Sequence, residues 1–295
     1  MKQNIELLRL IAVTLIVFTH TRHNFESGVF YFVIEKIPTF GTMVLSIISG
    51  YLYWSISRNK KKLFEKKVKS LLVPYFIANS SVIVLVLISN YVFGYNALNR
   101  LSFDYTLLTE GLLSLNSPPV NPPTYFVRDI FIVFVLAELL FKKNFKMLFI
   151  IIPLAFFGKL ILRYDVLIAF IIGAFIAQYY VYVLKYKKTI ISIALLFLVL
   201  TFIYFPFQSK FFIAIIAFVS VTNLNFKFVE VGGYSYLLHL YHSPVIVILY
   251  PVLSIFITNP YFLVIIQIIL ALFFCYLLYL FTRKFKFFKI LSGGR

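Results

Sequence analysis

Asn4-Ile-Glu-Leu-Leu-Arg-Leu-Ile-Ala-Val-Thr-Leu-Ile-Val-Phe-Thr-His20 opens the chain as an apolar stretch interrupted by three ionisable side chains. A helix that crosses the hydrocarbon core of a bilayer needs about 17–25 predominantly apolar residues. The stretch starts almost at Met1, has about the length of a full span and lacks the small-residue cleavage site of a signal peptide. It therefore predicts a first transmembrane helix, in which buried ionisable groups are candidates for function.

The rest of the chain continues in the same way. It is 62% hydrophobic and only 13% charged over 295 residues, whereas a soluble domain carries about a quarter charged residues. The single cysteine, Cys275, lies in an apolar block and can form neither a disulfide framework nor a cysteine metal site. We predict an all-α, polytopic transmembrane helical bundle, located as a multi-pass protein in the cell (plasma) membrane and surrounded by membrane lipids.

The apolar blocks predict about ten spans in a single integral membrane domain over 1–295. The spans are expected at about 5–21, 37–57, 71–93, 124–141, 145–160, 164–183, 189–206, 210–224, 234–257 and 260–282, followed by a basic cytoplasmic tail over 283–295. The fifth and eighth are the shortest, and losing or merging one changes the topology.

The basic residues support this count. With a cytoplasmic N-terminus and alternating sides, only seven of the 28 lysines and arginines fall outside. These seven are Arg22, Lys36, Arg100, Arg128, Lys159, Arg163 and Lys210. The excess on the inner side satisfies the positive-inside rule with both termini in the cytoplasm. The formal charge of +18 is spread over short loops, and the chain has no basic soluble module, so we predict no nucleic-acid partner.

The longest polar interruption runs from Gly94 to Pro123 and contains several asparagines and two proline pairs. Its backbone cannot lie exposed in hydrocarbon, so we expect it over the outer mouth of the bundle.

Arg9 and His20 are eleven residues apart. Eleven residues at 3.6 per turn make slightly more than three full turns, so a continuous helix projects both side chains from nearly one face, about 16 Å apart along the axis. Together with Glu6, this pattern indicates an internal cavity. Alternatively, Arg9 extends to the inner headgroups and His20 lies at the outer interface. Histidine is well suited to act as a general base.

Later spans carry further polar groups. Ser49-Gly50 in the second span permits close helix approach. The basic loop that ends before Pro74 either sets the topology or forms a phosphate-binding patch. His239 and His242 share a helix face, and Pro244 leaves a backbone carbonyl nearby without its donor. The chain lacks clear companion ligands, so we predict no metal site.

Six motifs, taken in order, resemble those of the acyltransferase-3 family of integral membrane acyltransferases. The matching segments are Arg9 with His20, Ser49-Gly50-Tyr51, Lys67 and Lys69 before Pro74, Tyr125-Phe-Val-Arg-Asp129, Ile171-Ile-Gly-Ala174 and Ser235-Tyr-Leu-Leu-His-Leu-Tyr-His242. The family usually has arginines at the two lysine positions and often tryptophan at the tyrosine of the fourth motif. Of the two late histidines, His242 is the one that corresponds. The resemblance covers nearly the whole chain and indicates a stand-alone member.

This resemblance implies transfer of an acyl group, most often acetyl, from cytoplasmic acetyl-CoA to a hydroxyl of a cell-surface or lipid-linked carbohydrate. Acetyl-CoA is then a donor substrate, and no bound cofactor is expected. The resemblance implies that His20 is a general base or a transient acyl carrier, and that Arg9, Lys67 and Lys69 bind the CoA phosphates. It implies that Tyr125, Arg128 and His242 orient the acceptor or stabilise the oxyanion. Glu6, Ser49, Gly50 and Tyr51 are implied to form a structural motif.

An alternative function is that of a transporter or flippase for a lipid-linked sugar, which explains ten spans and buried charges without chemistry. Against it, the sequence shows no internal repeat of the kind from which many transporters are built. The richness in lysine, isoleucine and phenylalanine is a compositional hint of an AT-rich bacterial source.

Overall fold

The apolar stretches fold as helices because a backbone inside hydrocarbon has to satisfy its N–H and C=O groups within its own segment. The computed structural model describes residues 2–94, 96, 98, 100–141, 159–222, 224 and 228–294. These residues contain helices, turns and loops and no strand, which confirms the predicted all-α class.

The helices follow one another in a simple order along the chain. They are α1 (Lys2–Phe18), α2 (Gly28–Tyr31), η1 (Phe32–Lys36), η2 (Ile37–Thr39), α3 (Phe40–Leu52), η3 (Tyr53–Ser57), α4 (Leu63–Lys67), η4 (Val68–Leu72), α5 (Val73–Phe93), η5 (Leu107–Leu112), η6 (Pro122–Thr124), α6 (Tyr125–Phe141), α8 (Tyr164–Gln178), α9 (Tyr180–Lys185), α10 (Lys187–Tyr204), α11 (Ser209–Val221), α12 (Gly232–Phe256), α13 (Pro260–Lys284) and η8 (Lys286–Ser292).

Five helical segments among the described residues are long and apolar enough to cross a membrane. They are Gly28–Ser57, Leu63–Val92, Lys187–Tyr204, Gly232–Phe256 and Pro260–Lys284. Tyr164–Gln178 and Ser209–Val221 are apolar but shorter. Helices α1 and α6 have 17 residues each and carry charged side chains. The count of ten spans and the cytoplasmic position of both termini stay predictions, and most of the predicted fifth span, 145–158, lies outside the described residues.

Some helix boundaries differ from those predicted. Helix α1 ends at Phe18, so His20 lies in a turn beyond it. The predicted sixth span is interrupted at Tyr179, whose φ of −106° and ψ of 28° leave helical geometry between α8 and α9. The second helical segment begins at Gly28, well before the predicted start. Composition locates these segments, but it carries no signal for a local break inside an apolar run.

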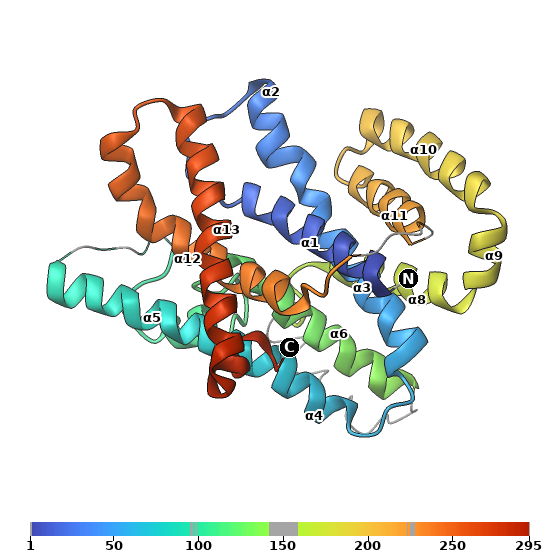
Figure 1. Ribbon diagram of the computed structural model, residues 1–295, viewed down its shortest axis with the longest axis horizontal. Helices are drawn as coiled ribbons and strands as arrows, with labels where there is room; N and C mark the ends of the chain where they lie inside the picture. Colours follow the sequence, from blue (N-terminus) through green and yellow to red (C-terminus); the bar gives the residue numbers. More distant parts are fainter. Residues whose placement is uncertain are drawn as a thin grey trace.

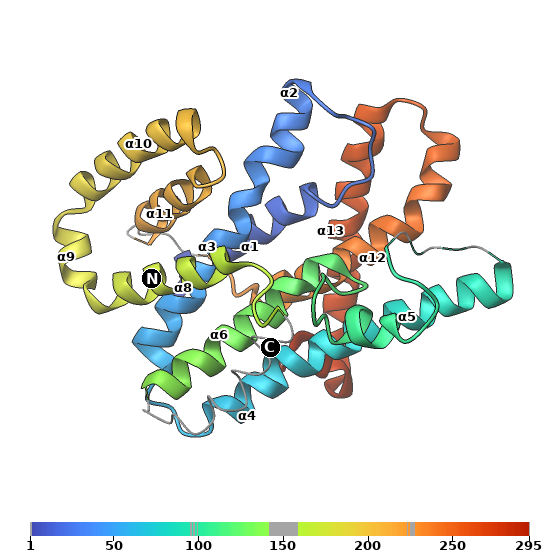
Figure 2. The ribbon, with the colours of Figure 1, turned by 180° about the vertical axis from the view of Figure 1, so that it is seen from behind.

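Helix α3 lies at the centre of the bundle and packs against α1, α8 and α11. Helix α12 packs against both α1 and α13. The α10–α11 pair forms one flank of the molecule and α5 extends on the opposite flank, as the two opposed views show (Figures 1 and 2). The contact of α1 with both α3 and α12 brings the first predicted motif beside the second and the last.

Two glycines allow α3 and α8 to cross with their backbones in contact. A Cβ added at Gly50 would meet the backbone carbonyl of Phe170, and one added at Gly173 would meet the backbone of Ile47. Glycine is required at both positions because any side chain would push the helices apart. The predicted close approach at Ser49-Gly50 is therefore present, and the glycine of the Ile171–Ala174 motif is its partner.

The polar segment from Gly94 to Pro123 lies against two helices. The Tyr75 hydroxyl of α5 donates to the carbonyl of Leu112 at 2.9 Å, and Asn121 Nδ2 donates to the carbonyl of Leu240 in α12 at 2.7 Å. At the other end of the chain, η8 packs on α13, α5 and α12. There Gly293, at a φ of +68°, lies against the backbone of Ser70, so the basic tail folds back onto the start of α5.

Candidate functional site

A cavity of about 130 Å³ lies where α1, α3, α6, α12 and the α4–η4 segment meet. Its lining combines apolar walls with a few polar groups. It is formed by Arg9, Val13, Leu45, Ile48, Ser49, Leu52, Lys67, Leu71, Phe126, Val127, Ile130, Phe134, Ser235, Tyr236 and His239. Five of the six predicted motif segments thus contribute to one cavity or flank it.

Two cations line this cavity. Arg9 Nη1 bonds Glu6 Oε1 at 2.7 Å, and the amino group of Lys67 lies 3.7 Å from the ring centroid of Phe134. A guanidinium has five N–H donors, so the ion pair with Glu6 leaves Arg9 with donors for a ligand. Gly232, the first residue of α12, packs against this pair, since a Cβ there would lie 3.1 Å from Glu6 Oε2. Lys69, predicted alongside Lys67, is exposed and does not line the cavity.

Three histidines extend from the cavity toward the end of α1. His239 lines the cavity, and its ring contacts Phe126 edge-on, with centroids 5.5 Å apart. The ring centroid of His242 lies 6.5 Å from that of His239 and 5.2 Å from that of His20. His20 itself does not line the cavity. The described residues thus give a cavity with His239 in its wall, and His20 lies two rings farther on.

The tautomer of His242 follows from its surroundings. Nδ1 lies 2.6 Å from the carbonyl oxygen of Leu238, and a carbonyl only accepts, so Nδ1 carries the proton. Nε2 is left as a lone-pair acceptor, and it is buried with no hydrogen-bond partner among the described residues. In this tautomer Nε2 cannot donate a hydrogen bond. The predicted role of His242 in orienting the acceptor or stabilising an oxyanion stays a prediction, and in this tautomer Nε2 serves it as a hydrogen-bond acceptor.

The turn that carries His20 is fastened to the core from a distant helix. The His20 amide donates to the carbonyl of Val17 at 3.2 Å, which tightens the chain after α1. Gln267 of α13 then accepts from the Arg22 amide at 2.7 Å and donates to the Arg22 carbonyl at 2.9 Å. Helical periodicity alone therefore does not place His20 relative to Arg9, because Thr19 and His20 lie in a turn beyond the end of the helix. Tertiary hydrogen bonds hold it instead.

Arg128 and Asp129 fasten the segment that precedes α8. Arg128 bonds Asp129 at 2.7 Å and donates to the carbonyls of Lys159 and Leu160. Asp129 accepts from the amides of Leu162 and Arg163. These contacts assign Arg128 to loop positioning, whereas the sequence predicted acceptor orientation or oxyanion stabilisation. The partner carboxylate is its own neighbour in the sequence.

Tyr125 and Tyr51 also lie outside the cavity lining. The guanidinium of Arg163 lies 5.6 Å from the centroid of the Tyr125 ring. The buried Tyr51 ring contacts Tyr180 and Phe218 at centroid distances of 5.8 and 5.2 Å. Tyr51 therefore packs α3 against α9 and α11.

The carbonyl left without a donor by Pro244 is that of Leu240, four residues earlier. Asn121 satisfies it from the polar segment, and Asn121 is held in turn by Asn79 and Thr124. All three side chains are buried. The sequence anticipated the free carbonyl next to His242 but did not identify Asn121 as the side chain that reaches it.

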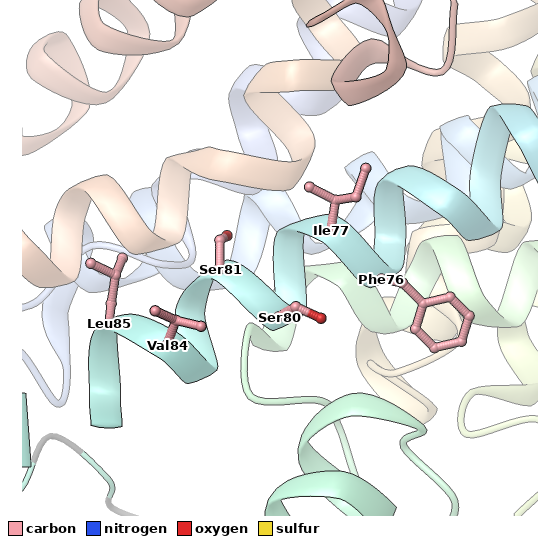
Figure 3. Close-up of a pocket in the computed structure, with 6 residues that line it drawn as sticks. All are labelled: Phe76, Ile77, Ser80, Ser81, Val84 and Leu85. Carbon is pink, nitrogen blue, oxygen red and sulfur yellow. The ribbon is translucent and has the colours of Figure 1, made fainter. Parts of the chain in front are cut away.

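A second, larger hollow lies on the outer face of α5 (Figure 3). Its lining residues Phe76, Ile77, Ser80, Ser81, Val84 and Leu85 all come from that helix. It has no cation or imidazole, and the Ser81 hydroxyl is already bonded to the carbonyl of Ala78. An open apolar helix face of this kind suits lipid contact and does not indicate chemistry.

Sequence reasoning missed two of the residues that matter here. The motif predicts His242 and not His239 as the functional residue, yet His239 lines the cavity. The three-residue spacing of the two histidines on α12 is the sequence feature that points to it. Gln267 carried no motif and is recognised only by its contacts. Within the described part of the chain, no group of three histidine, cysteine or acidic side chains could hold a metal ion.

The chain was compared with protein families, curated proteins and solved structures. The acyltransferase-3 family model, described as an acyltransferase domain, matches residues 2–280. Neither the curated proteins nor the solved structures give a match. The family match covers nearly the whole chain, including every motif discussed above. The chain therefore belongs to the acyltransferase-3 family of membrane acyltransferases.

Proposed function

We propose that this membrane acyltransferase moves an acetyl group from cytoplasmic acetyl-CoA to a hydroxyl of a cell-surface or lipid-linked carbohydrate. The observation that carries the proposal is a cavity lined by the cations of Arg9 and Lys67 and by His239, from which the rings of His242 and His20 continue in ring-to-ring contact. Phosphates bind to cations, and acyl transfer to a hydroxyl needs a base. The site residues thus supply both requirements.

The cavity favours a donor that enters with its thioester end first. Its volume of about 130 Å³ is below the ~300–1,000 Å³ of sites that enclose a drug-sized ligand. The cavity accommodates the acyl group and the part of the flexible CoA arm next to the thioester, while the nucleotide stays at the mouth. Arg9 and Lys67 then contact the phosphates at the cavity, and the exposed Lys69 adds charge to the basic loop outside.

Transfer takes place near His20. The acceptor hydroxyl loses its proton to the imidazole as its oxygen attacks the acyl carbon, and the CoA thiolate leaves and receives that proton. Alternatively, the imidazole attacks first and carries the acyl group transiently. In either route His239, at the end of the cavity, has to give way for the thioester to reach His20. We place the carbohydrate on the opposite side, beside the turn after α1 and the polar segment from Gly94 to Pro123.

The test uses the full chain purified in lipid nanodiscs with acetyl-CoA carrying ¹⁴C in the acetyl group. The acceptor probe is the carbohydrate fraction of a bacterial cell envelope, and the expected product is carbohydrate-bound label that alkali releases. A thiol reagent follows CoA release in parallel, because the only cysteine, Cys275, is buried. Absence of transfer, combined with movement of a lipid-linked sugar across reconstituted vesicles, would instead support a flippase.

A further inference from the structure

His242 has an unusual environment for a buried histidine. Its side chain is fully shielded, with 0% relative exposure, and one ring nitrogen is already committed to the Leu238 carbonyl at 2.6 Å. The other nitrogen, Nε2, has no hydrogen-bond partner among the described residues. A buried polar atom left without a partner is costly and requires an explanation.

The neighbour that can supply a donor is His20. The ring centroids of the two histidines lie 5.2 Å apart with planes inclined at 55°. The two rings are in contact but not hydrogen-bonded to each other, so an N–H of His20 reaches Nε2 of His242 only after a rotation of a ring or through one bridging water. Among the described residues, the ring that contacts His20 is that of His242, and no carboxylate forms an ion pair or hydrogen bond with His20. The acceptor that a carboxylate provides in a serine-protease triad would here be the His242 imidazole.

We propose that His242 is a positioning residue, which accepts the His20 N–H through its Nε2 lone pair and so fixes the tautomer and orientation of the His20 ring. This inference rests on the proposed function of His20. The Leu238 carbonyl holds His242 in the accepting tautomer, and His242 in turn leaves the second nitrogen of His20 free to take the proton of the acceptor hydroxyl. His242 neither gains nor loses a proton during transfer.

Three variants of the full-length protein in nanodiscs test this role. His242→Phe keeps a ring of similar shape but removes the lone pair, whereas His242→Gln restores an acceptor oxygen. Tyr241→Phe is the matched control, because it alters the neighbouring residue of α12 and leaves the imidazoles intact. We expect His242→Phe to lower kcat for ¹⁴C-acetyl transfer on the order of 100-fold while KM for acetyl-CoA stays within about twofold. His242→Gln recovers about tenfold of that loss, and Tyr241→Phe keeps wild-type kinetics.

A second measurement detects the interaction between the His20 and His242 rings without any turnover. The chain has four histidines, so ¹⁵N-histidine labelling gives few ring signals, and each can be assigned by substitution. The ring-nitrogen shifts of His20 are expected to change in His242→Phe and to stay unchanged in Tyr241→Phe. If His242→Phe fails to fold, as shown by its thermal melt, His242→Gln alone decides, through an unchanged KM and a lowered kcat.

The possible failures can be told apart. If His242→Phe leaves both the His20 ring-nitrogen shifts and kcat unchanged, the positioning role is overturned. Acetyl transfer by the wild type still supports the proposed function in that case. No acetyl transfer by the wild type overturns the proposed function, and the ¹⁵N shifts still report whether the two rings interact.

Discussion

Gln267 of α13 and the backbone of Arg22 exchange two hydrogen bonds, although 245 residues separate them in the chain. Gln267 is buried, at 1% exposure, and both the oxygen and the nitrogen of its amide bond the turn that follows α1. This pair ties the first and last predicted spans together immediately beside His20. The position of the proposed base therefore depends on a helix that has no motif of its own.

Gln267→Leu is expected to loosen this turn. The change leaves the Arg22 amide and carbonyl without partners, at a cost of about 1–3 kcal/mol in the free energy of unfolding. Misplacement of the base by about 1 Å lowers kcat as much as 100-fold, while KM for acetyl-CoA stays near the wild-type value. SDS unfolding and acetyl-transfer kinetics measure both effects. Gln208→Leu, at an exposed position, is the control, and an equally fast Gln267→Leu enzyme would contradict the fastening role.

His20→Ala is expected to abolish acylation and to leave the protein folded in the membrane. Loss of a general base lowers the rate by about 10²–10⁴-fold. The control is His23→Gln, which removes a nearby imidazole but keeps a side chain able to bond Glu35, its partner at 3.1 Å. Normal acetyl transfer by His20→Ala in the nanodisc assay would remove His20 from the chemistry.

The two lysines of the basic motif are expected to differ. Lys67 lines the cavity and Lys69 does not, so Lys67→Ala raises KM for acetyl-CoA more than Lys69→Ala. Loss of a hydrogen bond to a charged group costs about 1.5–3 kcal/mol, which corresponds to roughly 10–100-fold in affinity. Arg9→Ala shows a loss of the same order. Coenzyme A titration by calorimetry measures the affinities directly, and equal losses for both lysines would refute the distinction.

Gly50→Ala and Gly173→Ala are expected to destabilise the α3–α8 crossing. Each new methyl group meets the backbone of the facing helix, which cannot yield as a side chain can. Overpacking of this kind costs about 1–3 kcal/mol or more. Gly111→Ala is the milder control, since its nearest neighbour is the Leu101 side chain at 3.3 Å. SDS unfolding curves rank the three variants, and a Gly111→Ala loss as large as the others would contradict this explanation.

Acid is expected to loosen the polar segment around Glu110. Partial burial alone would raise the pKa of Glu110, but four hydrogen bonds from Asn116 and Ser117 hold that pKa below its ordinary value of 4.5. The stabilisation of the polar segment by ionised Glu110 is therefore fully present above pH 4.5 and is lost as the pH falls through the lowered pKa of Glu110. Hydrogen exchange over residues 110–119, corrected for intrinsic rates, should increase below that point.

Glu110→Gln supplies the comparison for this pH dependence. The variant is expected to exchange faster than wild type at pH 7 and to show little further change in acid. Peptides from α13, far from the segment, provide the internal reference. Identical pH profiles for the variant and the wild type would show that another group controls the segment.

Parts of the candidate site could be predicted from the sequence because they depend on local chemistry. Arg9 and Lys67 stand out as cations beside apolar runs, and both line the cavity. Glycine at position 50 indicates a close helix contact whatever the partner. The contacts of Arg128 could not be predicted, because the carbonyls it reaches, those of Lys159 and Leu160, are brought to it by chain folding and carry no side-chain signature.

The all-helical class and the family can be read from local sequence, because long apolar runs satisfy their backbone groups as helices and because the six motifs follow one another in the family's order. Which imidazole faces which depends on long-range packing. Helix α1 ends at Phe18, so no helical periodicity extends to His20. The position of His20 is set by Gln267 and its ring neighbour is His242, both more than 200 residues away. Such contacts follow from the packing of α12 and α13 against α1, which no local pattern encodes.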